Sequence, residues 1–333
     1  MILSPVLSEL KKRGAIIILH TSERGMIVFK NNPYVDEFIP YETNSVKIEE
    51  LNEYWAKLEW KYKIDKTINF CESIEVRLAL HPSSPQYNYT KKERYELCNK
   101  NYYDETFVVA GMPEIKGRLP EFYPTEEEEE KVRSYFDNLK DYFVILVGIS
   151  GSGVNKKYIW IGEVISEILK RYKGKVKFIT CGGEGDLELE NMIEKPLASK
   201  ELKEQLLNEI LIDEGVIDKV GKWNVRETFL ATKYADLVVA PDTGLLHASG
   251  CYDTPKIGLL GHTTKENITK YFKNDYSIEA ECNCAPCFRL IYQPFQCPLD
   301  YETGAVWCMS KGIPKEKVIK QIERVISESG KVK

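Results

Sequence analysis

The sequence predicts an α/β protein of two domains, each built around a parallel sheet. Its 333 residues exceed the size at which a single hydrophobic core usually stops growing. Short apolar runs alternate with amphipathic helical segments, most plainly in the second half of the chain, and this βαβα order is typical of doubly wound parallel sheets. A Pro-, Gly- and Glu-rich stretch at 113–124 indicates a linker, so we place the domains at 1–124 and 125–333.

The first domain is predicted to begin with a helix and a strand. Pro5 suits the first turn of the helix, and Gly14 ends it. The apolar run 15–19 is then a buried strand. His20 follows at its carboxyl end, where open α/β sheets place their ligands. A further short strand is expected at 68–70.

The second domain is predicted to begin at a capping box, because Thr125 is followed three residues later by Glu128. Its expected strands are at 143–147, 176–180, 237–240 and 257–260, and its closing helix is at 314–326. Whether the last helix packs on its own domain or back on the first one stays open.

Composition and charge exclude several classes of protein. The net charge of −5 argues against a protein that grips nucleic-acid phosphates, which needs a basic excess. No stretch approaches the roughly 18 apolar residues of a membrane span, and the short apolar start is not a secretory signal. We therefore expect a cytoplasmic protein without a nucleic-acid partner, and peripheral contact with the inner face of the membrane stays compatible with this charge.

A glycine-rich loop at 148–153 follows the strand at 143–147, and Lys156 comes shortly after it. Glycines allow backbone N–H groups to approach an anion, and a lysine adds a full positive charge. The spacing is not that of a Walker A loop. A phosphate-binding loop and a flexible turn are both compatible with this segment taken alone.

The segment 241–250 carries a stronger signal. A buried strand at 237–240 ends at Asp242, and Gly244 frees the turn that starts the next helix. The amides of Thr243, Gly244 and Leu245 can then face a diphosphate at that helix start. His247 falls one turn into the helix. In the alternative interpretation, Asp242 caps the helix and His247 is a structural histidine.

The segment from Asp242 to His247, followed by a Pro-led strand at 255–260 and by Gly261-His262-Thr263-Thr264, resembles glycosyltransferase family 9, the ADP-heptose:lipopolysaccharide heptosyltransferases. Further segments are similar to the same family: 5–10 followed by 32–37, then 148–156, and then 181–186. The resemblance spans nearly the whole chain and is faint between 83 and 123.

The resemblance implies a GT-B fold, in which two Rossmann-like domains face each other across a central cleft. The C-terminal domain would hold a nucleoside-diphosphate sugar such as ADP-heptose, and the N-terminal domain would hold a glycan or glycolipid acceptor. Thr243, Gly244 and Leu245 would bind the diphosphate, with Asp242 and His247 beside them. Ser150 and Lys156 would neutralise it from the opposite loop, and Glu184 would accept from the ribose hydroxyls. Transfer would be inverting and would need no metal.

The catalytic base is where the sequence departs from the family pattern. Relatives carry an Asp as candidate base in a segment that aligns just before Met1 of this chain. Either the true start lies upstream of Met1, or this strand and its base are absent. In the second case, His20 and Glu72 are the substitutes that the sequence offers. The resulting hypothesis is that the chain binds its donor more readily than it turns it over.

Five cysteines crowd into 282–308, namely Cys282, Cys284, Cys287, Cys297 and Cys308. Four of these thiolates could enclose a structural zinc ion, and the two-residue spacing before Cys287 fits a metal knuckle. Buried thiols without metal, disulfides and an iron–sulfur cluster remain the alternatives.

The sequence therefore predicts a sugar-nucleotide-dependent glycosyltransferase. Two other functions stay open: a catalytically impaired relative that binds nucleotide sugar, and another GT-B enzyme such as a sugar-nucleotide epimerase.

Overall fold

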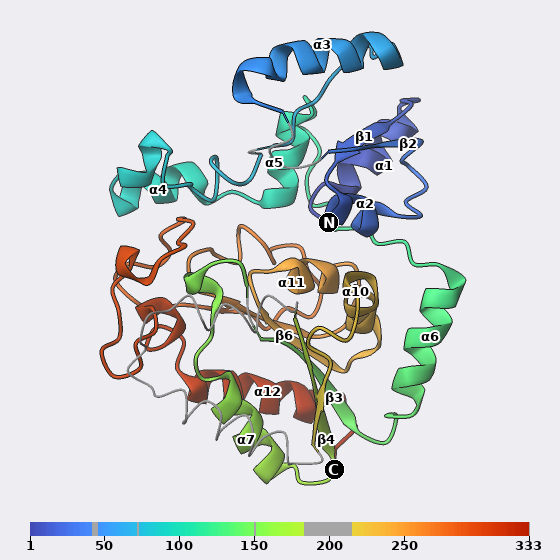
Figure 1. The fold of residues 1–333 in the computed structure, drawn as a ribbon. Helices are drawn as coiled ribbons and strands as arrows, with labels where there is room; N and C mark the ends of the chain where they lie inside the picture. The colour runs from blue at the N-terminus through green and yellow to red at the C-terminus, as the bar shows by residue number, and fades with distance from the viewer. Residues whose placement is uncertain (42–45, 72, 150, 183–214, 333) are drawn as a thin grey trace.

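The computed structural model describes residues 1–41, 46–71, 73–149, 151–182 and 215–332. Figure 1 shows a smaller N-terminal part above a larger C-terminal part, which the chain enters through a long helix at the side. No helix in these ranges combines the length and the apolar character needed to cross a lipid bilayer.

The C-terminal part is built on six parallel strands in the order β5-β4-β3-β6-β7-β8. They are β3 (Phe143–Gly148), β4 (Val176–Cys181), β5 (Val216–Asp218), β6 (Leu237–Pro241), β7 (Lys256–Leu260) and β8 (Ile278–Glu279). β6 and β7 are buried along their whole length, as expected for parallel strands that are covered on both faces. This sheet confirms the predicted doubly wound α/β arrangement.

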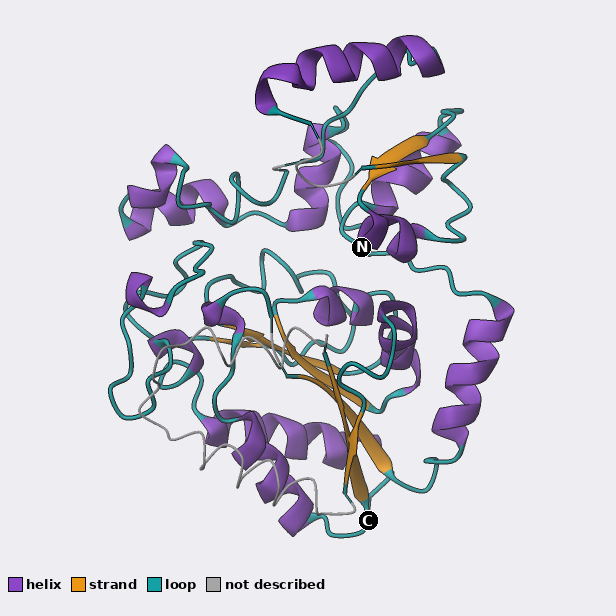
Figure 2. Cartoon of the chain, in the orientation of Figure 1, coloured by secondary structure: helices purple, strands orange, loops and turns teal. Residues whose placement is uncertain are grey.

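Helices cover both faces of this sheet (Figure 2). Alternate residues of β3 point to opposite faces: Phe143 and Ile145 join one apolar cluster, and Val144 and Leu146 join another. The first cluster includes α7 (Ile161–Arg171) and α12 (Lys315–Ser329), and the second includes α6 (Glu126–Asp137), α10 (Val225–Tyr234) and α11 (Gly244–Ser249). The last helix thus packs against the C-terminal sheet and α7.

The N-terminal part contains a smaller sheet than a full Rossmann unit. In the described ranges it has one parallel pair, β1 (Ile18–Thr21) with β2 (Glu37–Pro40). Its helices are α1 (Ser4–Lys12), α2 (Glu23–Phe29), α3 (Leu51–Tyr62), α4 (Lys91–Cys98) and α5 (Tyr102–Val109). The predicted strand at 68–70 is wrong: Ile68 and Phe70 instead pack irregularly against α1 and α5.

The first turns of α1 and α6 have the residues that the sequence analysis assigned to them. Pro5 lies in the first turn of α1, where its missing N–H costs no hydrogen bond. At the start of α6, the Thr125 hydroxyl accepts from the Glu128 amide while the Glu128 carboxylate accepts from the Thr125 amide. The predicted capping box is therefore confirmed, and the acidic first turn of α6 faces the positive end of the helix dipole.

A buried arginine joins the two parts of the molecule. Arg226 at the start of α10 is 4% exposed, and its guanidinium makes a two-pronged ion pair with Glu128 of α6, at 2.7 and 2.8 Å. The remaining N–H groups of Arg226 donate to the carbonyls of Ile27, Val28, Lys30 and Tyr123. The guanidinium therefore connects α10 and α6 to the C-terminal end of α2.

We expect Arg226→Ala to destabilise the protein by about 3 kcal/mol or more, because it leaves a carboxylate and several carbonyls without their donor. The urea midpoint of unfolding measures this.

The Arg226 hydrogen bonds also hold the pKa of Glu128 below its usual range. The stability that the Arg226–Glu128 pair contributes is therefore present above about pH 4.3 and is lost as the pH falls further.

Arg133→Ala is the matched control, because Arg133 forms an exposed ion pair with Glu130 on α6. Such surface pairs contribute about 0–1 kcal/mol. Equal shifts of the urea midpoint for the two variants would contradict the role assigned to Arg226.

Candidate functional site

Three loops meet at the carboxyl edge of the C-terminal sheet. β3, β6 and β7 are neighbours in the sheet, so the segments that follow them lie together. They are the glycine-rich loop that leads to Lys156, the turn at Asp242 and Thr243, and Gly261-His262. This edge is where open parallel sheets bind ligands.

Asp242 lies at the centre of this site. It is 5% exposed, and three basic side chains surround its carboxylate. The Lys156 ammonium is 3.9 Å from Oδ2, His247 Nε2 is 3.4 Å from Oδ1, and His262 Nε2 is 3.5 Å from Oδ2. The structure thus brings together Lys156, Asp242 and His247, which the sequence predicted, and adds His262.

The electrostatics of this group favour an ionised Asp242. Burial by itself raises the pKa of the carboxyl, but the Lys156 charge and the contact with His247 outweigh burial and hold the pKa well below its usual value. The carboxylate is therefore charged at neutral pH. It fixes the Lys156 ammonium, whose side chain is 16% exposed, at the edge of the site where an anion could approach it.

His247 is positioned from the other part of the molecule. The hydroxyl of Tyr103, in α5, lies 2.7 Å from His247 Nδ1, and both side chains are buried. Nε2 of the same ring faces Asp242. A residue of the N-terminal part thereby holds the orientation of a histidine in the C-terminal site.

His262 is buried, and among the described residues neither of its ring nitrogens has a hydrogen-bond partner. Burial lowers the pKa of His262 to about 4, although the nearby Asp242 carboxylate acts in the opposite direction. The imidazole is therefore neutral at pH 7. A buried polar group of this kind in a ligand-binding edge is a candidate contact for a bound molecule.

The glycines bring the loops close together. A Cβ on Gly151 would lie 2.9 Å from Thr243 Cγ2 and 2.8 Å from Lys156 Cβ, so no larger residue fits there. α11 starts at Gly244 with Thr243 as its N-cap. The alternative in which Asp242 caps this helix is therefore wrong. Leu245 is buried beneath the turn, while Gly244 is exposed.

Three of the predicted site residues, Ser150, Glu184 and Glu72, lie outside the described ranges. His20 is in β1, within an aromatic cluster of Tyr41, Tyr54 and Trp55. Its Nε2 lies 2.6 Å from the Tyr54 hydroxyl, and burial lowers the pKa of His20. A neutral imidazole of this kind can accept a proton.

Sequence reasoning missed two members of the site, Tyr103 and His262. His262 follows the carboxyl end of β7, and the same rule that selected Asp242 could have selected it. Tyr103 carries no comparable signal, because its contact with His247 depends on how the two parts of the chain pack.

The cysteine-rich segment lies next to this site. Cys284, Cys287, Cys297 and Cys308 line one cavity, and Cys282 is not among its lining residues. Burial raises the pKa of the Cys297 thiol to about 12. Across the described part of the chain, no three side chains of the ligating types are already arranged around a common metal position.

The fold defines the class of protein. The chain matches solved structures of the GT-B type along nearly its whole length. These include a glycosyl transferase family 9 protein from Veillonella parvula (TM-score 0.64, 17% identity, 98% of this chain and 93% of that one). They also include ADP-heptose lps heptosyltransferase II of E. coli (TM-score 0.63, 14% identity, 99% and 95%).

Sequence comparisons agree with the fold. The model of glycosyltransferase family 9 (heptosyltransferase) matches residues 196–294, which include the Asp242 turn. Lipooligosaccharide heptosyltransferase 2 of Campylobacter jejuni is 21% identical, over 98% of this chain and 94% of that protein. The resemblance to glycosyltransferase family 9 is thus confirmed, and it supports sugar transfer as the general activity.

A third solved relative is TibC, an iron-containing dodecameric heptosyltransferase of enterotoxigenic E. coli, which was solved with ADP-D-β-D-heptose. The complex has a TM-score of 0.55 at 8% identity and covers 98% of this chain and 74% of that one. At this identity the likeness concerns the fold.

We expect the stability of the protein to depend on His262 between pH 6.5 and 4. A buried histidine with a folded pKa near 4 and an unfolded pKa of about 6.5 binds fewer protons in the folded state. Stability is therefore lost as the pH falls through this interval, by up to about 3 kcal/mol. Urea unfolding at several pH values measures the loss.

His262→Gln removes the titrating group, so its stability should fall less steeply over the same interval. His81→Gln, outside the site, is the control and should keep the wild-type slope. Parallel pH profiles for wild type and His262→Gln would show that His262 is not a buried neutral imidazole.

Proposed function

We propose that this protein transfers a sugar, heptose-like, from a nucleoside-diphosphate donor to a glycan or glycolipid acceptor. The observation that carries the proposal is the meeting of Lys156 with the Asp242-Thr243-Gly244 turn at the carboxyl edge of β3 and β6. A fixed ammonium group opposite the start of a helix is an arrangement that suits two linked phosphates.

The donor would lie with its diphosphate between the two loops. The first N–H groups of a helix have no intrahelical partner, so the amides of Thr243, Gly244 and Leu245 are available as donors at the start of α11. Lys156 would neutralise the phosphates from the other side. By the family resemblance, Ser150 would assist Lys156, and Glu184 would accept from the ribose hydroxyls.

This arrangement suits transfer without a catalytic metal. The leaving group is a nucleoside diphosphate, and its developing negative charge would be stabilised by backbone N–H groups and Lys156 that are already in position. His262 adds a neutral imidazole to the same edge, and His247 lies beside it next to Asp242. An inverting displacement would follow if a base on the acceptor side removes the proton of the acceptor hydroxyl, and His20 and Glu72 are the candidates for this base.

The relatives support a heptose donor and a lipid-linked acceptor. The solved E. coli protein is an ADP-heptose lps heptosyltransferase, and the Campylobacter jejuni relative acts on lipooligosaccharide. By analogy, the acceptor of this chain would be the growing core of a lipopolysaccharide. Contact with the membrane surface where such an acceptor lies is part of the same proposal.

The direct test measures transfer, hydrolysis and epimerisation of ADP-heptose and UDP sugars in parallel, with and without EDTA. Transfer to a lipopolysaccharide-core acceptor, with inversion and unaffected by EDTA, is expected. Donor binding without turnover would indicate an impaired relative. Epimerised donor would indicate another GT-B enzyme, and an absence of nucleotide affinity would refute the proposal.

We expect Lys156→Ala to weaken the binding of ADP by about 10- to 100-fold, because a hydrogen bond to a charged group contributes about 1.5–3 kcal/mol. Replacing Thr243 as well should weaken it further. Calorimetry measures both affinities, and Lys170→Ala, which removes a lysine from the exposed side of α7, serves as the control of equal charge. Unchanged affinity in the double variant would exclude this diphosphate site.

We expect Tyr103→Phe to reduce donor affinity by about two- to tenfold, because it removes one hydrogen bond worth about 0.5–1.5 kcal/mol and frees the His247 ring to reorient. Calorimetry with ADP measures the change. Tyr95→Phe, at an exposed tyrosine of α4, is the control. A loss of equal size in both variants would mean that the Tyr103–His247 contact does not act on the donor.

A further inference from the structure

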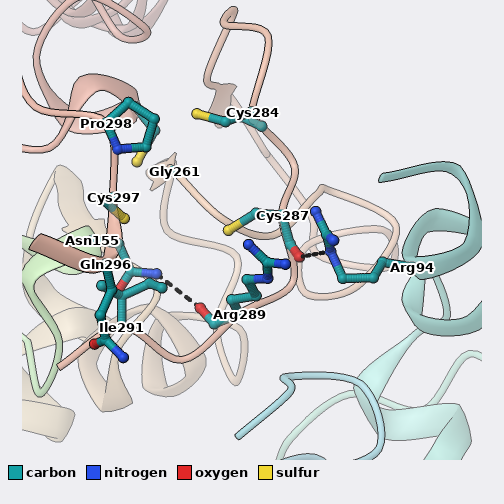
Figure 3. A pocket seen from close by; sticks show the side chains of 12 residues that line it. Arg94, Asn155, Gly261, Cys284, Cys287, Arg289, Ile291, Gln296, Cys297 and Pro298 are labelled. Carbon is teal, nitrogen blue, oxygen red and sulfur yellow. Dashed lines mark hydrogen bonds between the residues drawn. The ribbon is translucent and has the colours of Figure 1, made fainter. Parts of the chain in front are cut away.

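Four cysteines surround a single cavity (Figure 3). The cavity lies beside the loops that follow β3 and β7, and these two loops together with the turn after β6 are the donor loops. The cavity has a volume of about 60 Å³, more than the roughly 10–15 Å³ that one water molecule requires. Cys284, Cys287, Cys297 and Cys308 line it, and in Figure 3 the labelled sulfur atoms of Cys284, Cys287 and Cys297 point toward the same space. The segment therefore presents its thiols inward.

Two arginines line the same cavity, Arg94 from α4 and Arg289 from the cysteine-rich segment. Arg94 is 6% exposed. Its Nε donates to the Cys287 carbonyl at 2.8 Å, and Nε of Arg289 donates to the Tyr87 carbonyl at 2.8 Å. Within the described ranges, neither guanidinium forms an ion pair with a carboxylate. Arg289 also lies over the Tyr87 ring, 4.6 Å from its centroid. Two neighbouring positive charges without a carboxylate partner favour a negatively charged group between them.

We propose that this cavity binds one thiophilic divalent cation, zinc or ferrous iron, through the thiolates of Cys284, Cys287, Cys297 and Cys308. Both ions accept four thiolates in a tetrahedron, with zinc–sulfur bonds of about 2.3 Å. On binding, each thiol releases its proton to solvent and forms one sulfur–metal bond. The complex then carries two negative charges, and Arg94 and Arg289 balance them.

Cys282 is outside the proposed ligand set. Its sulfur lies 3.5 Å from the sulfur of Cys284, but Cys282 does not line the cavity. Cys284 and Cys287 have the two-residue spacing of a metal knuckle, and Cys297 and Cys308 enter from two later turns. Cys282 therefore supplies a control within the same loop.

The loop that would hold the ion contacts two segments that are distant from it in the sequence. Lys91 and Arg94 of α4 bind the carbonyls of Asn283 and Cys287. Around the same loop, the Leu80 amide donates to the Phe288 carbonyl, and the Leu290 amide donates to the Leu80 carbonyl. A bound ion would stabilise this junction between α4, the segment at Leu80 and the C-terminal sheet.

The cavity also adjoins the donor site. Asn155 and Gly261 line it, and the residues that follow them, Lys156 and His262, contact Asp242. A Cβ on Gly261 would lie 3.2 Å from the Cys308 sulfur. Loss of the ion should therefore disturb the donor loops and weaken donor binding. This coupling between the metal site and the donor site rests on the proposed function.

The first experiment measures the metal content of the full chain purified without chelator under reducing conditions, by mass spectrometry of the elements. About one zinc or iron ion per chain is expected, and the element found distinguishes the two ions. Exchange for Co²⁺ should then give the strong absorption bands of tetrahedral cobalt with thiolate ligands. A protein that holds no metal and gives no cobalt spectrum would overturn the proposal, as would two disulfides formed among the four cysteines.

Variants test the ligand set. Cys297→Ser should lose most of the bound metal or the tetrahedral thiolate spectrum, whereas Cys282→Ser should keep both. Equal loss in the two variants would contradict the ligand set. If Cys297→Ser fails to fold, the cobalt spectra of the wild-type protein and Cys282→Ser still decide the matter.

Coupling to the donor site is measured separately. Protein freed of metal by chelation should bind ADP several-fold more weakly and recover on addition of Zn²⁺. Bound metal without any ADP affinity would refute the proposed function and leave the metal site standing. ADP binding by a protein that holds no metal would refute the metal site and leave the proposed function standing.

Discussion

The buried carboxylate of Asp242 is the interaction on which the rest of the site depends. It lies at the end of a fully buried strand, where the Lys156 charge and the contact with His247 keep it ionised, and the neutral His262 lies 3.5 Å away. Through these contacts one side chain sets the position of residues from three loops and, by way of His247, of Tyr103 in the N-terminal part. The site is therefore a single electrostatic unit rather than a set of independent contacts.

Its position follows from the topology of the sheet. β3, β6 and β7 are adjacent and parallel, so three segments of very different sequence position begin at one edge. The glycines at the start of these segments let them approach closely, as the contacts around Gly151 and Gly261 illustrate. In the proposed function, these loops would hold a diphosphate on one side, while the cysteine-lined cavity lies behind them on the other.

The sequence was most informative where local chemistry decides the outcome. The buried strands at β3, β6 and β7 were predictable from their apolar runs, and the capping box at Thr125 from its Thr-x-x-Glu pattern. The grouping of Lys156 with Asp242 and His247 was expected from the family resemblance, and it agrees with the strand-end rule. The strand predicted at the short apolar run 68–70 was wrong, because an apolar run does not show whether a neighbouring strand is there to pair with it. Tyr103 and the ligation state of the cysteines depend on tertiary packing, which a single sequence does not encode in any local pattern.

The two parts of the molecule are fastened at several separate places, among them the Tyr103–His247 contact. Arg226 holds the end of α2 on one side, and the backbone bonds of Leu80 with Phe288 and Leu290 hold the other. Hinge opening requires the two parts to separate on one side while they stay in contact on the other. With both sides attached, large rigid-body opening would break several buried bonds at once, so substrates would exchange through small local displacements of loops.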